Sequence, residues 1–125
     1  MEPRMKIDLE SALSRHDPVI IELGCGPRKR AGRIGIDRLD LPQVDIVADL
    51  EAGLKFLPDR SVDEIHCRSF LEHVQNFEHL FAEMVRVLKD DGRACIFVPH
   101  FSNPYYYSDY THKRPFGLYT FYYFT

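Results

Sequence analysis

The sequence predicts an α/β fold built on a mostly parallel β-sheet. Short apolar segments of strand length alternate along the chain with connecting segments, one of which has a clear helical pattern. The first apolar segment, Val19 to Leu23, is broken only by Glu22, which is typical of a parallel strand that is buried on both faces. Strands that alternate with helices favour right-handed crossovers and therefore a parallel sheet.

Five strands and one strong helix follow from this pattern. The strands are predicted at residues 19–23, 33–37, 44–48, 62–67 and 93–99. A helix is predicted from Phe77 to Lys89, with Asn76 as its N-cap and Gly92 as its stop. Its apolar residues form one stripe, at Phe77, Leu80, Phe81, Met84, Val85 and Leu88. A leading helix is predicted over residues 8–15.

Composition excludes several classes of protein. The chain has 125 residues, 45% hydrophobic and 28% charged, which suits one soluble domain. A net charge of −3 gives no electrostatic case for nucleic acid or an anionic membrane as a partner. No apolar run reaches the roughly 20 residues of a membrane-spanning helix, and residues 1–16 lack the apolar stretch of a signal peptide. We therefore expect a cytoplasmic protein.

The cysteines and histidines do not indicate a metal site. The three cysteines are far apart in the sequence, and the six histidines show no metal-binding spacing. We expect no metal, and we expect the cysteines to be reduced and to lie within or beside strands.

Glycines or charged residues follow four successive predicted strands. Gly24 and Gly26 follow the first strand and let the backbone approach a ligand closely, because they have no Cβ. Asp37 ends the second strand, and Asp49 follows the third. The fourth is followed by residues 68–74, Arg-Ser-Phe-Leu-Glu-His-Val. Ligands of parallel α/β sheets bind beyond the carboxyl ends of the strands, so we expect a ligand site at this edge.

Together these motifs resemble the class I S-adenosylmethionine-dependent methyltransferases, over roughly residues 17–117. E-L-G-C-G-P at 22–27 resembles the family's first motif. The other segments that carry the resemblance are G-I-D at 35–37, A-D-L at 48–50, L-P-D-R-S-V-D-E-I at 57–65, L-E-H-V at 71–74, R-V-L-K-D-D-G-R at 86–93 and T-H-K-R-P-F at 111–116. Only ten residues separate Gly26 from Asp37, so a loop or single turn is expected there in place of the family's usual helix.

The resemblance implies a Rossmann-like sheet and S-adenosylmethionine as cofactor. It implies that Gly24 and Gly26 lie against the methionine part, that Asp37 binds the ribose hydroxyls and that Asp49 accepts the adenine amino group. Further residues implied on the cofactor side are Glu22, Cys25, Arg38, Leu50, Arg68 and Ser69. The division implied is an N-terminal segment at 1–16, a cofactor-binding core at 17–100 and an aromatic substrate-side segment at 101–125.

The function implied is methyl transfer to a small-molecule acceptor by direct SN2 displacement. A hydroxyl acceptor needs a general base, for which His112 is the first candidate, followed by His100 and His73. Tyr105, Tyr106 and Tyr107 are expected to belong to a substrate-side lid, where aromatic rings stabilise a sulfonium.

Some alternatives stay open. Gly24 and Gly26 also suit a tight turn, Asp37 suits a solvated turn, Asp49 suits the cap of a short helical turn over residues 50–52, and His73 suits a structural role. Residues 28–30, Arg-Lys-Arg, suit a solvated basic loop rather than a nucleic-acid patch. A nicotinamide-binding domain is disfavoured because Lys29 stands where its third glycine belongs.

The aromatic C-terminal segment suggests a different class of function. Of the 16 aromatic residues, 11 lie between Phe101 and Phe124, and residues 118–124 look like the start of a sixth strand. We expect the chain to be truncated or completed by another chain, for example as a homodimer through this edge. A non-catalytic cofactor-binding or interaction module is therefore the alternative function.

Overall fold

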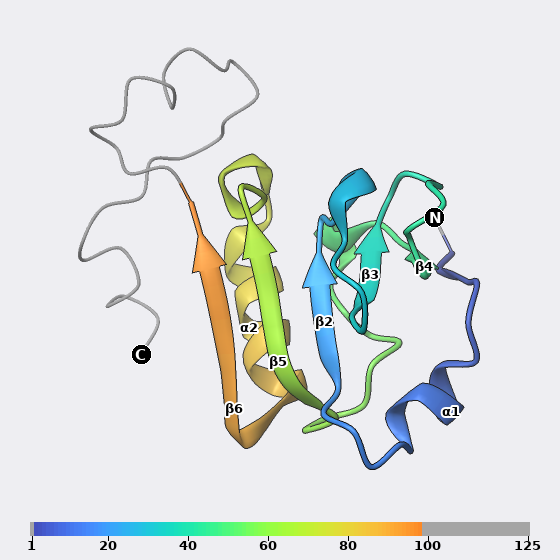
Figure 1. Cartoon of the computed structure of the whole chain (residues 1–125). Helices are drawn as coiled ribbons and strands as arrows, with labels where there is room; N and C mark the ends of the chain where they lie inside the picture. The colour runs from blue at the N-terminus through green and yellow to red at the C-terminus, as the bar shows by residue number, and fades with distance from the viewer. Residues whose placement is uncertain (1, 99–125) are drawn as a thin grey trace.

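The computed structural model describes residues 2–98 and has a six-stranded sheet at its centre (Figure 1). The strands lie in the order β1-β4-β3-β2-β5-β6, with β1 antiparallel to β4 and all other neighbours parallel. They are β1 (Arg4–Met5), β2 (Ile20–Leu23), β3 (Ile34–Asp37), β4 (Ile46–Val47), β5 (Val62–Arg68) and β6 (Leu88–Phe97). The predicted mostly parallel α/β sheet is confirmed, and β1 is a strand that the sequence pattern did not predict.

Short helical segments connect the strands within residues 2–98. They are α1 (Leu9–Leu13), η1 (Gly26–Arg28), η2 (Leu50–Ala52), η3 (Leu71–His73) and α2 (Phe77–Val87), of which the three η segments are single 3-10 turns. The single turn predicted after Gly26 is confirmed. The leading helix is shorter than predicted: it is capped by Asp8, which accepts from the Ser11 N–H, and it ends at Leu13 with Ser14 as its C-cap.

Helix α2 covers one face of the sheet and lies behind β5 and β6 in Figure 1. The predicted stripe is mostly confirmed: α2 buries Phe77, Leu80 and Met84 in the main core, together with Val87, which the stripe did not include. Val85 was wrongly placed in this stripe and is 59% exposed. Sheet residues in the same core include Ile21, Leu23, Ile36, Ile46, Ile65 and Cys67.

The predicted boundary between α2 and β6 is wrong. The helix ends at Val87 and the strand begins at Leu88, with no loop between them. Leu88 pairs with Val62, and the Ser61 N–H donates to the Val87 carbonyl, so sheet pairing begins where helical pairing stops. Residues 89–92 form an irregularity between the Val62–Leu88 and Glu64–Arg93 pairs.

Asn76 is not the side-chain cap that the sequence predicts. It occupies the N-cap position, but its side chain makes no capping bond to the helix. Its Nδ2 instead donates to the Glu51 carbonyl at 3.3 Å, which ties the start of α2 to η2.

The strand order creates a topological switch at β2. From β2 the chain continues to β3 and β4 on one side, and later to β5 and β6 on the other. Ligands of open α/β sheets bind in the crevice at such a point. The carboxyl ends of β2, β3 and β5 therefore form the expected ligand site.

Candidate functional site

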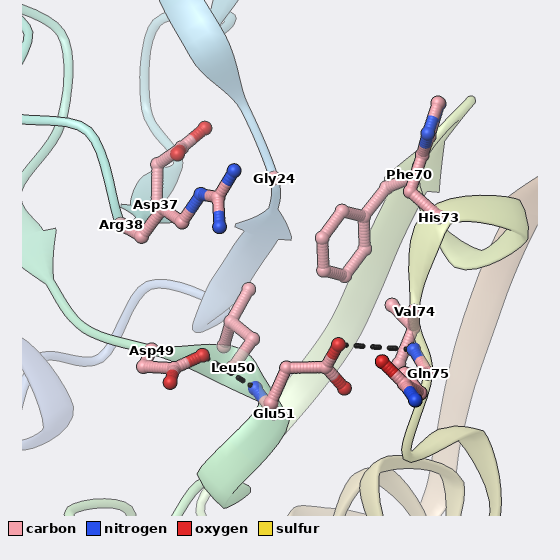
Figure 2. A pocket seen from close by; sticks show the side chains of 10 residues that line it. All are labelled: Gly24, Asp37, Arg38, Asp49, Leu50, Glu51, Phe70, His73, Val74 and Gln75. Carbon is pink, nitrogen blue, oxygen red and sulfur yellow. Dashed lines mark hydrogen bonds between the residues drawn. The ribbon is translucent and has the colours of Figure 1, made fainter. Parts of the chain in front are cut away.

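Two adjoining cavities lie at the carboxyl edge of the sheet. We call the first the Asp37 cavity: it has a volume of about 580 Å³ and is lined by residues of the β3, β4 and β5 ends (Figure 2). We call the second the arginine cavity: it has a volume of about 890 Å³ and is bounded by the ends of β2, β5 and β6 and by the loop after Gly26. Gly24 lines both cavities and so marks the divide between them.

The turn after β2 requires its glycines for different reasons. Gly24 has φ +64°, and a Cβ on it would lie 2.3 Å from Cδ1 of Phe70, so a side chain fits neither the backbone nor the space. Gly26 has φ +54°, but a Cβ there would meet nothing within 4 Å. Gly24 therefore permits the packing of Phe70, whereas Gly26 leaves open space at the arginine cavity.

Asp37 is fixed by the backbone on both sides of its carboxylate. Its Oδ2 accepts from the Gly26 N–H at 2.9 Å, and its Oδ1 accepts from the Leu39 N–H at 3.0 Å. Each carboxylate oxygen has a further lone pair for another donor. Asp37 thus links the glycine turn to the end of β3 and still presents acceptor capacity to its cavity.

Asp49, in the turn after β4, both stabilises that turn and lines the Asp37 cavity. Asp49 caps η2, because its Oδ1 accepts from the Glu51 N–H at 3.0 Å. This confirms the structural role considered for Asp49, which also lines the Asp37 cavity together with the buried Leu50.

Glu51 joins the two walls of the Asp37 cavity and was missed in the sequence. Its Oε2 accepts from the Gln75 N–H at 2.9 Å and its Oε1 from the Asn76 N–H at 2.8 Å. The bond to Gln75 is drawn in Figure 2. One carboxylate thus holds η2 against the segment that begins α2. The sequence signal for Glu51 was an acidic residue directly after the A-D-L segment. Its role could not be predicted from that signal, because its partners lie 24 and 25 residues further along the chain.

The end of β5 turns sharply toward the cavities. Ser69 has φ +51°, a strained value for a residue with a Cβ, and its N–H donates to the Phe97 carbonyl at 2.7 Å. The Arg68 guanidinium lies over the Phe97 ring, 5.0 Å from its centroid. Arg68 and Ser69 line the arginine cavity, whereas His73 lines the Asp37 cavity.

Glu22 and Cys25 lie deeper in the arginine cavity. The Glu22 carboxylate, 9% exposed as a residue, pairs with Arg33 at 2.7 Å, so its negative charge is neutralised within the fold. Burial, with smaller contributions from Asp37 and Glu22, raises the pKa of the Cys25 thiol to about 11. The thiol is protonated at neutral pH and is a poor nucleophile.

The structure therefore divides the predicted cofactor-side residues into two groups. Gly24, Asp37, Arg38, Asp49 and Leu50 line the Asp37 cavity. Glu22, Gly24, Cys25, Gly26, Arg68 and Ser69 line the arginine cavity. The predicted residues His100, Tyr105, Tyr106, Tyr107 and His112 lie outside the described residues.

One group of side chains in residues 2–98 is close enough together to hold a metal ion. The ligand atoms of Glu64, His66 and Cys95 all lie within 4.8 Å of one another. The Glu64 oxygens, however, already contact His66 at 2.7 Å and Arg93 at 3.1 Å. The group is explained by this ion-pair network, and the absence of a metal site stays a prediction. Over the same residues, the helices are too short or too polar to cross a membrane.

Similarity to known proteins agrees with this architecture. The chain matches the family described as "Methyltransferase domain" over residues 27–96, more than half of its length. It is similar in fold to the crystal structure of a SAM-dependent methyltransferase from Archaeoglobus fulgidus, with a TM-score of 0.72 and 20% sequence identity. That match covers 92% of this chain and 62% of the other, so this chain spans less than two thirds of that protein. No curated protein matches it.

The chain therefore belongs to the methyltransferase domain family. The resemblance to the class I S-adenosylmethionine-dependent methyltransferases is confirmed by the family match and by the fold.

Proposed function

We propose that this chain binds S-adenosylmethionine across the Gly24 divide and supports methyl transfer to a small-molecule acceptor. The observation that carries this proposal is the position of Asp37. Its carboxylate ends β3, faces a cavity at the topological switch and is bonded to the glycine turn on the neighbouring strand. This arrangement suits a ligand that has a vicinal diol in one cavity and a polar tail in the other.

The residues present fit this cofactor. The remaining lone pairs of Asp37 suit the two ribose hydroxyls, and Asp49 with the apolar Leu50 suits an adenine ring. The open space beside Gly26 lets a methionine tail approach the backbone of the turn. We propose Glu22, Cys25, Arg38, Arg68 and Ser69 as the surrounding contacts.

When bound, S-adenosylmethionine supplies an electrophilic methyl group, which the acceptor takes by direct displacement while the sulfur keeps the electron pair of the broken bond. The contribution of the chain is to align donor and acceptor, which is worth several orders of magnitude in rate. The protonated Cys25 thiol does not compete as a nucleophile. His112, followed by His100 and His73, is the proposed base for a hydroxyl acceptor.

Calorimetric titration with S-adenosylhomocysteine tests this proposal. We expect the wild-type chain to bind and Asp37→Ala to weaken binding by about tenfold or more, because charge-assisted hydrogen bonds are lost. Asp49→Ala should weaken binding less, since this residue also caps η2. Asp90→Ala, an acid whose side chain is 87% exposed, is the matched control and should bind like the wild type.

Two outcomes of this titration bear on the class of protein. A wild-type chain that fails to bind S-adenosylhomocysteine would refute the proposed function. Binding without methyl transfer to any acceptor would instead support the alternative of a non-catalytic cofactor-binding module.

A further inference from the structure

Positive charge is concentrated in the arginine cavity. Four arginines line it, Arg28, Arg30, Arg33 and Arg68, and Glu22 is the one carboxylate among its described lining residues. The chain as a whole has a net charge of −3, so this excess of cations does not reflect the overall composition. The neighbouring Asp37 cavity has the opposite balance, because its lining holds one arginine, Arg38, and three carboxylates, those of Asp37, Asp49 and Glu51 (Figure 2).

Three of these arginine charges have no acidic partner within residues 2–98. Arg33 is neutralised by Glu22 at 2.7 Å. Arg68 lies against the Phe97 ring, which leaves its charge in place. Neither Arg28 nor Arg30 forms an ion pair in this part of the chain, although salt bridges elsewhere in it are numerous.

The loop that carries Arg28 and Arg30 is anchored through the residue between them. Lys29 Nζ pairs with Asp45 Oδ2 at 2.7 Å, and both side chains are mostly buried. The same Asp45 oxygen accepts from the Gly35 N–H at 2.8 Å, which fixes the anchor to β3. Lys29 therefore holds the loop while Arg28 and Arg30, on either side of it, line the cavity.

The cofactor alone does not balance this charge. Its sulfonium and ammonium groups are cationic and its carboxylate is anionic, so its methionine part has a net positive charge at neutral pH. A cavity of about 890 Å³ lies near the upper end of the volumes usual for ligand sites, so it has room for a second molecule beside that part. Arg28 and Arg30 are exposed, so beside a neutral or cationic acceptor only water would solvate their charges, whereas an anionic acceptor can pair with them.

We infer that the methyl acceptor is an anion, a small molecule whose phosphate or carboxylate group is bound by Arg28 and Arg30 in the arginine cavity. This inference rests on the proposed function. Guanidinium groups bind both kinds of anion through paired hydrogen bonds, which makes arginine suited to this recognition. The anionic group serves as a handle that orients the acceptor, and the methyl group goes to a different atom of the same molecule.

The test measures anion binding by the full chain directly. Inorganic phosphate and malonate are titrated separately into the chain, first saturated with S-adenosylhomocysteine and then free of it. The variant is Arg28→Gln/Arg30→Gln. Its matched control is Arg15→Gln/Lys55→Gln, which removes two positive charges from exposed residues that line neither cavity.

We expect at least one anion to bind, and the Arg28→Gln/Arg30→Gln variant to weaken that binding by about tenfold or more. The control should change it by less than about twofold, as expected for screened charges. Tighter binding of phosphate would indicate a phosphorylated acceptor, and tighter binding of malonate a carboxylated one. The inference is wrong if neither anion binds, or if variant and control lose affinity equally.

The two proposals can fail separately in this experiment. A wild-type chain that does not bind S-adenosylhomocysteine would refute the proposed function. An intact response to S-adenosylhomocysteine with anion binding that ignores Arg28 and Arg30 would refute the anionic acceptor alone.

Discussion

The two ends of the parallel sheet hold their charged side chains in different ways. At the end where α2 finishes, Arg86 donates to the carbonyls of Leu54 and Leu57 and to the carboxylates of Asp59 and Glu83. At the carboxyl edge, Arg28 and Arg30 line a cavity without an acidic partner in residues 2–98. Arg86 is fully paired where it joins segments of the chain, whereas Arg28 and Arg30 are available to a ligand.

The largest effect on stability is expected from Arg86→Met, at the end of the sheet where α2 finishes. The substitution keeps much of the apolar volume, but it leaves two carbonyls without their donor and Glu83 with the Leu54 N–H alone, which costs about 2–3 kcal/mol of unfolding free energy. The Tm should fall by about 10 °C for a chain of this size. Thermal unfolding followed by circular dichroism measures this shift.

Arg60→Met is the matched control for Arg86. Arg60 pairs with Asp90 at 3.5 Å, but its side chain is 73% exposed, and exposed pairs contribute little. An equal fall in Tm for both variants would show that the paired end does not owe its stability to the Arg86 network. Folded Arg86→Met should still bind S-adenosylhomocysteine like the wild type, because Arg86 lines neither cavity.

An intermediate effect on stability and ligand affinity is expected from Glu51→Ala. This residue lies at the ligand-binding end of the sheet but is paired like Arg86 at the other end. Glu51 belongs to the ligand edge, yet its carboxylate is occupied by two backbone donors. The variant should lose about 1–2 kcal/mol of stability and, because the walls of the Asp37 cavity are no longer tied, about threefold in S-adenosylhomocysteine affinity. Urea unfolding and calorimetry measure the two losses separately.

Glu78→Ala is the control for Glu51. Glu78 is an exposed acid in the first turn of α2, and it does not line the Asp37 cavity. It should leave ligand affinity unchanged. A Glu51→Ala variant that loses stability but binds normally would make Glu51 a structural residue and not a positioning residue.

The smallest effect concerns how stability depends on pH through Asp63, which lies at the same end of the sheet as Arg86. The Val19 N–H, and then Lys89, hold the pKa of Asp63 below its ordinary value of about 3.9. Because the folded pKa is the lower one, the stabilisation is complete above the ordinary value and is lost as pH falls through the folded value. Between pH 6 and pH 2.5 the Tm of the wild type should therefore fall more steeply than that of Asp63→Asn.

The expected difference for Asp63 is below about 1 kcal/mol, since the side chain is partly exposed. Lys89→Gln should reproduce part of it, because Lys89 Nζ lies 3.1 Å from Asp63 Oδ2. Parallel pH profiles for the wild type and Asp63→Asn would contradict the assigned role.

The central strands could be predicted because a local run of apolar residues indicates that they are buried. Ile21 and Leu23 lie in a nearly continuous apolar run, and the helix stripe repeats with the period of an α-helix. Strand β1 could not be predicted, because two residues carry no periodicity and its pairing with Val47 and Ile46 spans more than forty residues. The end of α2 failed for a related reason: Leu88 continues the helical pattern, but it pairs with Val62.

The candidate site divides in the same way. Asp37 and the glycines could be found because strand ends mark them, and parallel strands bring their carboxyl ends to one edge. Glu51 and the Lys29 anchor could not be found, since their roles depend on partners in other segments. Asp49 was open to two roles, and the structure shows the capping role while leaving the side chain in the cavity wall.

Strand β1 also has a consequence for how the chain meets other proteins. It lies at one end of the strand order, where unpaired backbone groups invite another chain to add a strand. Two residues are too few to template such an addition, and the side chains of Arg4, in β1, and of Lys6, just after it, pair with Asp40. This border of the sheet is therefore a poor template for edge-to-edge pairing.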